Sequence, residues 1–295
     1  IYTLSLHDAL PISGTIPYMG ERYLSLVRFA VEEAQRRGMQ VMLYDEAMYP
    51  SGSAHGQVAA ENPTFASQCL CMERSEEPVP AEAGIVAVGE AAVAGDRVLS
   101  AARLAPAEGA YRPAPGQTLL IFRQRPSGGT IRGVHEEEDD GEENAPASAD
   151  LLNPAAVQAF IRLTHERYWA ALAPHFGRTI RAIFTDEPSI MGRNALPGGI
   201  PWTWDFLPEF GEAAELPALF LDMGEKTAAI RSRYRQRIHQ RLKRAYYGQL
   251  SAWCASHGVA LTGHPAGSGD IGLLADFQIP GQDLVWRFVG PGNGI

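Results

Sequence analysis

The sequence has little cysteine, no long apolar segment and fewer basic than acidic residues. Three cysteines, Cys69, Cys71 and Cys254, do not make a disulfide framework, and we expect free thiols rather than a metal site. No apolar run approaches the length that crosses a bilayer, so no membrane segment is predicted. The 25 basic and 34 acidic residues give a net charge of −9, which disfavours a general nucleic-acid-binding protein and suits a neutral substrate such as a sugar.

One local pattern occurs three times: a glycine, a short apolar run, and then polar residues of the types used in catalysis. Residues 38–46 read GMQVMLYDE, residues 177–187 read GRTIRAIFTDE, and residues 258–264 read GVALTGH. A glycine just past a helix supplies its left-handed cap, and a short apolar run is typical of a buried parallel strand. The pattern predicts an α/β fold of parallel βα units, with the site at the carboxyl ends of the strands.

The fold class that we predict is a partial (β/α)8 TIM-type barrel with a small antiparallel β subdomain inserted. Residues 13–65 form the first part of the barrel and residues 150–295 the second part. Together they are shorter than the about 250 residues of a full barrel, so we expect an incomplete one. Within residues 66–149 the alternating segments SQCLCMER, GIVAVGE, DRVLSAARL and TLLIFRQR predict the antiparallel strands. The acidic run at 136–143 fits no calcium-loop spacing and is predicted to be a solvated loop.

Three helices are predicted from apolar residues at helical spacing. The first spans residues 21–37, with an apolar face of Leu24, Val27, Val31 and Ala34. The second spans residues 153–172 and begins at Asn153-Pro154, an N-cap followed by proline in the first turn. The third spans residues 230–253 and carries many arginines. A basic helix with aromatics can bind nucleic acid, but the apolar stripe favours a surface helix of the barrel.

The acidic pairs at two strand ends are the main candidates for catalysis. We assign Glu187 as the general acid and Asp186 as its catalytic neighbour, whose negative charge would favour a protonated Glu187. Asp45 and Glu46 are assigned to sugar hydroxyls or a metal, with Glu46 the second choice for catalysis. The alternative for each is a polar strand end that satisfies the amides of the following loop.

Further substrate-binding candidates lie on the predicted loops. Residues 47–63 are rich in Gly, Ser and Pro and carry His55, which suits either a ligand-binding loop or an ordinary connector. Trp202 and Trp204 lie on a predicted loop over the site and can stack on a sugar face or pack in a core. His264 is a candidate donor to a sugar hydroxyl, and Asp270 follows in the next loop.

Both ends of the chain carry unusual sequence. Ile1–Ile12 match, codon for codon, one reading frame of a common sequencing adapter, so we expect an artefact rather than a natural strand. The native N-terminus is then expected upstream of residue 13, which leaves the compartment, cytoplasmic or secreted, open. At the other end the apolar run 283–289 is expected to begin another strand, so we expect an internal fragment.

Several motifs taken together resemble a known family. They are LYDEAMYPSGSAHGQVAAENP, FTDEPSI followed by IPWT and LPALF, and HGVALTGHP, in this order within residues 13–65 and about 150–289. This set resembles the α-L-rhamnosidases of glycoside hydrolase family 106. The resemblance implies a (β/α)8 catalytic barrel with extra β domains, inverting hydrolysis of a terminal sugar, and a calcium ion that can help to hold the sugar hydroxyls. It also implies a further strand ending in a glutamate, the second catalytic carboxylate, beyond this chain.

The function expected from residues and resemblance together is a glycoside hydrolase that removes a terminal, α-L-rhamnoside-like sugar from a polysaccharide or glycoside. Such a reaction needs one carboxyl group as acid and a second as base or nucleophile. Two alternatives stay open: another barrel glycosidase, such as a β-galactosidase-like enzyme, and a non-catalytic carbohydrate-binding relative. The expected partner is a carbohydrate, with no nucleic acid and no membrane.

Overall fold

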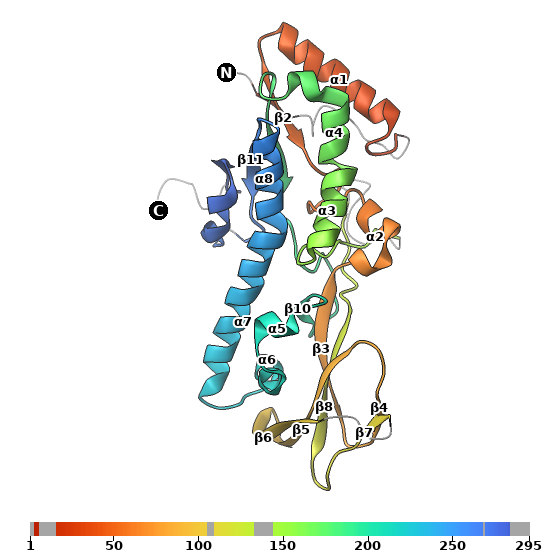
Figure 1. The fold of residues 1–295 in the computed structure, drawn as a ribbon, viewed down its shortest axis with the longest axis vertical. Helices are drawn as coiled ribbons and strands as arrows, with labels where there is room; N and C mark the ends of the chain where they lie inside the picture. Colours follow the sequence, from red (N-terminus) through yellow and green to blue (C-terminus); the bar gives the residue numbers. More distant parts are fainter. Residues whose placement is uncertain (1–2, 6–15, 105–108, 133–143, 268, 284–295) are drawn as a thin grey trace, which may run out of the picture. The chain divides into compact units, whose positions relative to one another are not determined.

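The computed structural model describes residues 3–5, 16–104, 109–132, 144–267 and 269–283, and the chain divides into two compact units (Figure 1). We call them the parallel unit and the antiparallel unit after their sheets. The parallel unit contains Ile1–Ala66, Thr130–Arg193 and Leu242–Ile295. The antiparallel unit contains Ser67–Gly129 and Asn194–Arg241. Each unit is therefore built from segments that are far apart in the sequence.

The parallel unit is a mixed α/β structure around a sheet of five strands. Their order is β1-β2-β9-β11-β12, and every neighbouring pair is parallel. The strands are β1 (Thr3–Ser5), β2 (Gln40–Tyr44), β9 (Ile180–Asp186), β11 (Ala260–His264) and β12 (Ile279–Pro280). The predicted parallel sheet is confirmed. Because neighbours in the sheet are also successive in the unit, each strand adds to the same side of the one before it. Closure into a barrel is not seen in the described residues and stays a prediction.

The sequence pattern explains why these strands form where they do. Val41 and Leu43 of β2 are buried, and β9 and β11 contribute the buried Ile183 and Leu261 to the same core. Burial of one such aliphatic side chain stabilises the fold by about 1.5–3 kcal/mol. The glycines predicted to stop the preceding helical segments all have positive φ, which confirms their left-handed conformation: Gly38, Gly177 and Gly258.

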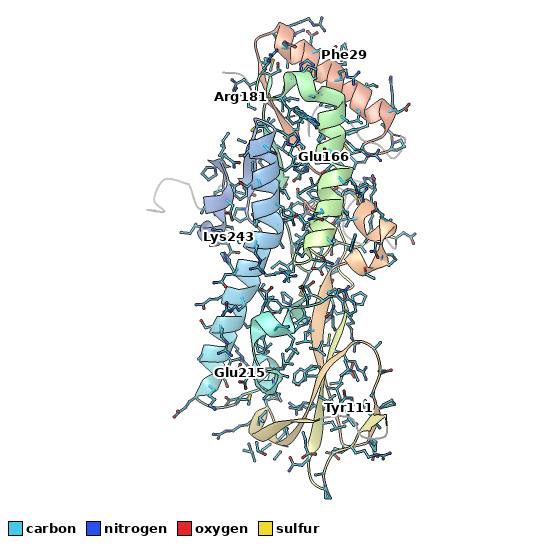
Figure 2. All side chains as sticks on the ribbon, in the orientation of Figure 1. Phe29, Tyr111, Glu166, Arg181, Glu215 and Lys243 are labelled. Atoms are coloured by element: carbon cyan, nitrogen blue, oxygen red, sulfur yellow. The ribbon has the colours of Figure 1, made fainter. Side chains whose placement is uncertain are left out.

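Helices flank this sheet. α1 (Glu21–Arg36) packs against β2, and α8 (Gly248–Ser256) packs against β11. The buried face of α1 differs from the predicted one by a single position: Tyr23 is buried in place of Leu24, while Phe29 lies exposed on the outer side (Figure 2). The Tyr23 hydroxyl explains the difference, because it hydrogen-bonds to the Tyr168 hydroxyl at 2.8 Å and so draws the first turn inward.

The helix predicted over residues 153–172 is divided into α3 (Pro154–Leu163) and α4 (His165–Leu172). Its start is confirmed, since the Asn153 side chain accepts a hydrogen bond from the amide of Ala155. The break lies at Thr164, whose hydroxyl donates to the carbonyl of Phe160 at 2.8 Å, a backbone contact that bends helices. On α4, Glu166 (labelled in Figure 2) accepts the indole N–H of Trp253 from α8 at 2.5 Å.

The antiparallel unit contains the four predicted strands, which confirms the antiparallel character of this region. Its main sheet has the order β10-β3-β8-β5-β6, and β4 pairs with β7 in a second, two-stranded sheet. The strands are β3 (Gln68–Ser75), β4 (Val79–Pro80), β5 (Ile85–Ala94), β6 (Arg97–Leu104), β7 (Ala110–Tyr111), β8 (Thr118–Pro126) and β10 (Ile200–Trp202). Whereas the expected insertion spans residues 66–149, the unit ends its first segment at Gly129 and adds residues 194–241.

The predicted third helix is longer than expected and changes its winding. α7 (Lys226–Leu242) continues into a π-helical turn, η4 (Lys243–Tyr247), and then into α8. Within the described residues, no helix is both long and apolar enough to cross a bilayer. The three cysteines are free, as expected. The acidic run 136–143 and residues 284–289 of the last apolar run lie outside the described residues.

The remaining helical elements are short. In the parallel unit they are α2 (Gln57–Glu61), η1 (Pro63–Phe65), η2 (Ala173–His175) and η5 (Ile271–Asp276). In the antiparallel unit they are α5 (Leu207–Phe210), η3 (Ala213–Glu215) and α6 (Pro217–Phe220).

Candidate active site

The carboxyl ends of β2, β9 and β11 meet at one edge of the parallel sheet. Asp186 is the register partner of His264, and the amide of Asp45 donates to the carbonyl of Phe184 at 3.0 Å. Phe184 is in turn the register partner of Tyr44. The edge therefore brings together the polar residues that end the three predicted strands. We call it the carboxylate edge: Asp45, Glu46, Asp186, Glu187 and His264.

Asp186 is held from both sides. Its Oδ2 accepts a hydrogen bond from the Tyr44 hydroxyl at 2.8 Å, and its Oδ1 lies 3.5 Å from Nδ1 of His264. The His264 ring packs edge-on against Phe184 with centroids 5.0 Å apart, which fixes its orientation. About a quarter of the Asp186 and His264 side-chain surface stays exposed, so both can meet a ligand.

Glu187 leaves the strand through an unusual backbone conformation. Its φ of +42° lies in the left-handed region, which is uncommon for glutamate and is typical of functional sites. The turn interrupts the strand alternation that would send neighbouring side chains to opposite faces. The Glu187 carboxyl accepts a hydrogen bond from the Tyr49 hydroxyl, as Asp186 accepts one from Tyr44. The Asp186 carboxyl thus contacts the last residue of β2, and the Glu187 carboxyl contacts the segment that follows β2.

Two guanidinium groups stand over the tyrosine that contacts Glu187. The Cζ atoms of Arg132 and Arg193 lie 5.4 and 5.9 Å from the centroid of the Tyr49 ring. Cations at this distance are attracted by the face of an aromatic ring. Burial raises the pKa of Tyr49 above its usual range, and its hydrogen bond to Glu187 raises it further. Tyr49 is therefore a hydrogen-bond donor to Glu187 throughout the physiological range.

Asp45 is fully buried at this edge. Its Oδ1 accepts from the Ser51 hydroxyl at 2.7 Å, and among the described residues its Oδ2 has no hydrogen-bond partner. Ser51 also ties the edge together, because its oxygen accepts the amide N–H of Asp186 at 2.8 Å. Burial raises the pKa of Asp45 well above its usual range, and the charges of Glu46 and Asp186 add to this, against the Ser51 hydrogen bond. We expect a neutral carboxyl group there.

Glu46 organises the loop that follows β2. Its buried carboxylate accepts hydrogen bonds from four backbone amides, those of Ala47, Ser53, Ala54 and His55, at 2.5–3.0 Å. Residues 54–56 are all left-handed, and such runs point successive N–H groups at an anion. Burial raises the pKa of Glu46 to about 7, although the four amides favour its ionised form. The geometry favours the alternative given above, a strand end that satisfies loop amides.

The other predicted binding residues are placed differently. His55 contributes its amide to Glu46, and its exposed ring lies 6.1 Å from that of Tyr18. Asp270 is exposed just before η5. The two tryptophans belong to the antiparallel unit. There Trp202 is a core residue, 1% exposed and packed on Phe206 at 4.9 Å, whereas Trp204 is 48% exposed.

A glycine at the end of β11 lets this edge form. Gly263 has a φ of +136°, and a Cβ at this position would lie 1.8 Å from the carbonyl oxygen of Thr185 on β9. No side chain fits at that distance. The close approach of the two strands places His264 against Asp186, so the glycine in the TGH sequence has a positioning role.

Sequence reasoning missed the hydroxyl and guanidinium groups of the site. Tyr44, Tyr49 and Ser51 flank the predicted acidic pair in the sequence LYDEAMYPS, so their positions next to it could have suggested donors. Arg132 is far from both acidic pairs in sequence. Arg193 follows Glu187 by six residues, but it is far from Tyr49 in sequence, so neither contact with Tyr49 could have been predicted.

The described part of the edge does not offer the donor set of a calcium site. Calcium takes six to eight oxygen ligands. Among the described residues no group of three or more His, Cys, Asp or Glu side chains could hold a metal ion. Asp45 is buried and predicted neutral, and Asp186 is engaged by Tyr44 and His264. The calcium ion that the family resemblance implies stays a prediction, and no step of the chemistry is derived through it.

Comparison with known proteins finds similarity in structure but no match in sequence. No family model and no curated protein matches the sequence. Among solved structures, the chain is similar to a rhamnosidase from Novosphingobium sp. PP1Y, with a TM-score of 0.49 and 11% sequence identity. The match covers 85% of this chain and 41% of that one, so the chain spans well under two thirds of the rhamnosidase. The resemblance to glycoside hydrolase family 106 stays a prediction from the sequence motifs.

Proposed function

We propose that this chain is part of a glycoside hydrolase that removes a terminal, α-L-rhamnoside-like sugar. The observation that carries the proposal is the Asp186-Glu187 pair at the end of β9, where each carboxyl accepts a hydrogen bond from a tyrosine hydroxyl. Strands that add in chain order, with their carboxyl ends at this edge, support a (β/α)8 barrel around it. The sequence motifs quoted above support the substrate class.

Glu187 is the proposed general acid. Tyr49 fixes its Oε2, so the proton to be transferred sits on Oε1 and meets the leaving-group oxygen. As the glycosidic bond breaks, positive charge develops on the sugar ring, and the Asp186 carboxylate, held by Tyr44, stabilises it. His264 donates a hydrogen bond to a sugar hydroxyl.

The base of the reaction comes from elsewhere in the protein. Asp45 is buried with its pKa raised well above its usual range, and Glu46 is saturated by loop amides, so neither suits the activation of water. The family resemblance assigns this role to a glutamate on a further strand, and we propose the same here. Within the chain, Asp45 and Glu46 are then positioning residues that hold the 47–56 loop at the carboxylate edge.

The test is Glu187→Gln in the protein that carries this chain. We expect turnover of an aryl α-L-rhamnoside to fall at least about 10²-fold, the usual contribution of a general acid, while the unfolding curve stays unchanged. The exposed Glu225→Gln is the matched control and should keep full activity. Unchanged turnover by Glu187→Gln would sink the assignment. Hydrolysis of β-galactosides alone would favour the other barrel glycosidase, and sugar binding without any hydrolysis would favour the carbohydrate-binding relative.

A further inference from the structure

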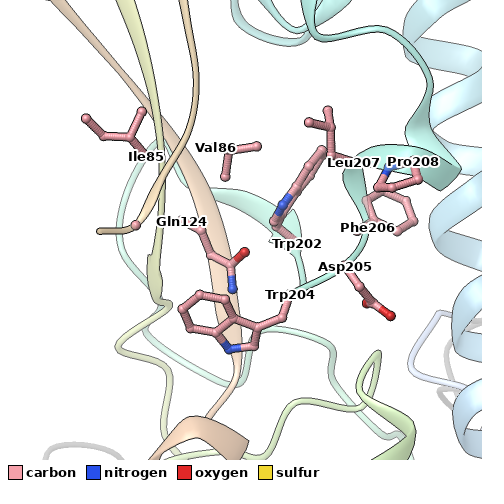
Figure 3. A pocket seen from close by; sticks show the side chains of 10 residues that line it. Ile85, Val86, Gln124, Trp202, Trp204, Asp205, Phe206, Leu207 and Pro208 are labelled. Atoms are coloured by element: carbon pink, nitrogen blue, oxygen red, sulfur yellow. The ribbon is translucent and has the colours of Figure 1, made fainter. Parts of the chain in front are cut away.

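The antiparallel unit contains a pocket of about 290 Å³ lined only by residues of that unit (Figure 3). Strands β5 and β8 provide one wall, and the segment from Trp202 to Pro208 provides the other. The volume is near the lower end of the range for small-molecule pockets, about 300–1,000 Å³, and suits a single ring. We call it the tryptophan pocket.

Most of the lining of the pocket is apolar, and two of its aromatic rings pack against each other. Trp202 and Phe206 are buried and pack edge-to-face with centroids 4.9 Å apart. Above them, Ile85, Val86 and Leu207 line the space together with Trp204. Trp204 is 48% exposed, so its indole presents a flat face that is open to a ligand. Burial of that face against the apolar side of a ring would be favourable without any rearrangement of the core.

One polar side chain in this lining has a buried donor with no hydrogen-bond partner among the described residues. Gln124 is only 8% exposed, and its Nε2 has no hydrogen-bond partner among the described residues. It lies on the same face of β8 as Leu120 and Phe122, both buried and apolar. Figure 3 shows its amide extending toward Trp204. A buried donor left unpaired destabilises a fold, so an apolar residue would be more stable here.

The one charged side chain in the pocket's lining belongs to an ion-pair network, in which Arg241 is shared with Glu209. Asp205 is the one ionisable residue in its lining, and its carboxylate accepts a hydrogen bond from Arg241 at 2.8 Å. Figure 3 shows that carboxylate turned away from the other lining side chains. The remaining recognition groups are the indole face and the Gln124 amide. They fit a neutral ligand that has an apolar face and a hydrogen-bond acceptor at its edge.

We propose that the tryptophan pocket binds one ring of a neutral saccharide. The C–H face of the ring stacks on the Trp204 indole, and a ring or hydroxyl oxygen accepts the unpaired N–H of Gln124. The choice of a saccharide rests on the proposed function of the carboxylate edge, whereas the pocket and its unpaired donor do not. The site is a binding site and needs no catalytic group.

The experiment uses the 295-residue chain labelled with ¹⁵N and follows its five tryptophan indole N–H signals. L-rhamnose, D-galactose and p-nitrophenol are the probes. We expect a sugar to shift the Trp204 signal, which is assigned by its loss in Trp204→Phe. The Kd should rise about tenfold in Trp204→Ala, measured from the other signals and by calorimetry, and change less than about threefold in Trp204→Phe.

The variant Gln124→Leu tests whether the Gln124 amide binds a ligand or stabilises the fold. It should raise the Kd about tenfold and at the same time raise the Tm, because it removes a buried unpaired donor. A structural role for the amide would instead lower the Tm. Leu99→Ala, which shortens an exposed apolar side chain on β6 outside the pocket, is the control and should change neither value. The titration is repeated on Asp186→Asn, and binding at the tryptophan pocket should persist.

Three results would overturn the inference: no sugar binding by the chain, sugar binding unaffected by Trp204→Ala and Gln124→Leu, or binding of p-nitrophenol without either sugar. The result of this experiment can be distinguished from the result of the test of the proposed function. Sugar binding that depends on Trp204, in a protein without hydrolytic activity, would overturn the proposed function and support this inference. Hydrolysis that depends on Glu187, with no Trp204-dependent binding, would do the reverse.

Discussion

Among single residues, His165 shows how burial sets the protonation state of a side chain. The ring lies between Phe160 and Trp253 at 5.6 and 5.1 Å, and its Nδ1 is 2.7 Å from the Thr164 hydroxyl. Its Nε2 has no hydrogen-bond partner among the described residues. Burial, together with the charge of His257, lowers the pKa of His165 to about 3. The folded chain therefore holds a neutral imidazole well below the pH at which a free histidine takes up a proton.

This depressed pKa predicts an acid-dependent loss of stability. Between the unfolded pKa near 6.5 and the folded pKa near 3, the unfolded chain binds more protons at His165, so stability falls as the pH falls. Binding of one extra proton by the unfolded chain changes the unfolding free energy by about 1.4 kcal/mol per pH unit. Denaturant unfolding of wild type and His165→Leu between pH 6 and 4 should show slopes that differ by about this amount.

One other titrating group and one control variant bear on this pH dependence. The raised pKa of Glu46, about 7, acts in the opposite sense, since its contribution falls as the pH rises from 4.5 through 7. Glu46 is present in both proteins, so its effect cancels in the difference. His239→Leu, which removes a partly exposed histidine, is the matched control for the loss of one imidazole. Equal slopes in wild type and His165→Leu would contradict the prediction.

The positions of catalytic candidates follow from sequence, but their surroundings do not. Asp186 and Glu187 could be placed at a strand end because an apolar run stops there and Pro188 follows. The part played by Glu46 depends on a turn with left-handed residues 54–56, which brings the amides of residues 53–55 to its carboxylate and which no periodicity encodes. The contact of Arg132 and Arg193 with Tyr49 likewise depends on long-range packing.

At the level of secondary-structure elements, the most direct test is of the close approach between the end of β11 and β9 at Gly263. Gly263→Ala would place a Cβ 1.8 Å from a backbone oxygen of β9 and force a φ of +136° on a residue with a side chain. We expect a loss of more than about 3 kcal/mol of unfolding free energy, or failure to fold, because neither backbone can move without breaking the ladder. Denaturant unfolding followed by circular dichroism measures the loss.

A second glycine of the following loop provides the matched control. A Cβ added at Gly269 would meet no atom within 4 Å. Gly269→Ala should therefore stay within about 0.5 kcal/mol of wild type, as surface substitutions usually do. If Gly263→Ala were as stable as Gly269→Ala, the close approach of β11 and β9 would be wrong, and with it the placement of His264 against Asp186.

Elements with strong local signals could be predicted, and those that depend on distant partners could not. The three core strands and their glycine stops follow from apolar runs and from the left-handed preference of glycine. The break at Thr164 was missed because threonine is tolerated inside helices, and only its hydrogen bond to Phe160 bends this one. The three residues of β10 gave no signal of their own, since they become a strand by pairing with β3.

In the molecule as a whole, the chain crosses between its units more often than the sequence suggests. The antiparallel unit takes residues 194–241 as well as residues 67–129 of the predicted insertion, so the segment with both tryptophans belongs to it. Composition marks where the strand pattern changes at residue 66, but it does not say which later segment returns to the same sheet. The assignment of segments to units depends on pairing across more than a hundred residues, as between β3 and β10.

The first twelve residues are predicted from their sequence to be an artefact, and their contribution to stability tests this prediction. Thr3–Ser5 form the edge strand β1 and pair in parallel with β2 over three residue positions. Any short extended segment can add to an open sheet edge through its backbone, so this pairing does not require a sequence selected for it. Deletion of residues 1–12 should therefore lower the unfolding free energy by less than about 1 kcal/mol, a change in Tm of about 2–4 °C at most.

The measurement compares thermal unfolding of the 295-residue chain with that of the deletion variant, and a second variant shows whether side chains matter. Exchange of residues 3–5 for three threonines keeps an extended backbone and should leave the Tm unchanged. A fall of more than about 10 °C on deletion would mean that β1 contributes several kcal/mol. In that case residues 1–12 would be an integral part of the sheet, and their interpretation as an artefact would have to be abandoned.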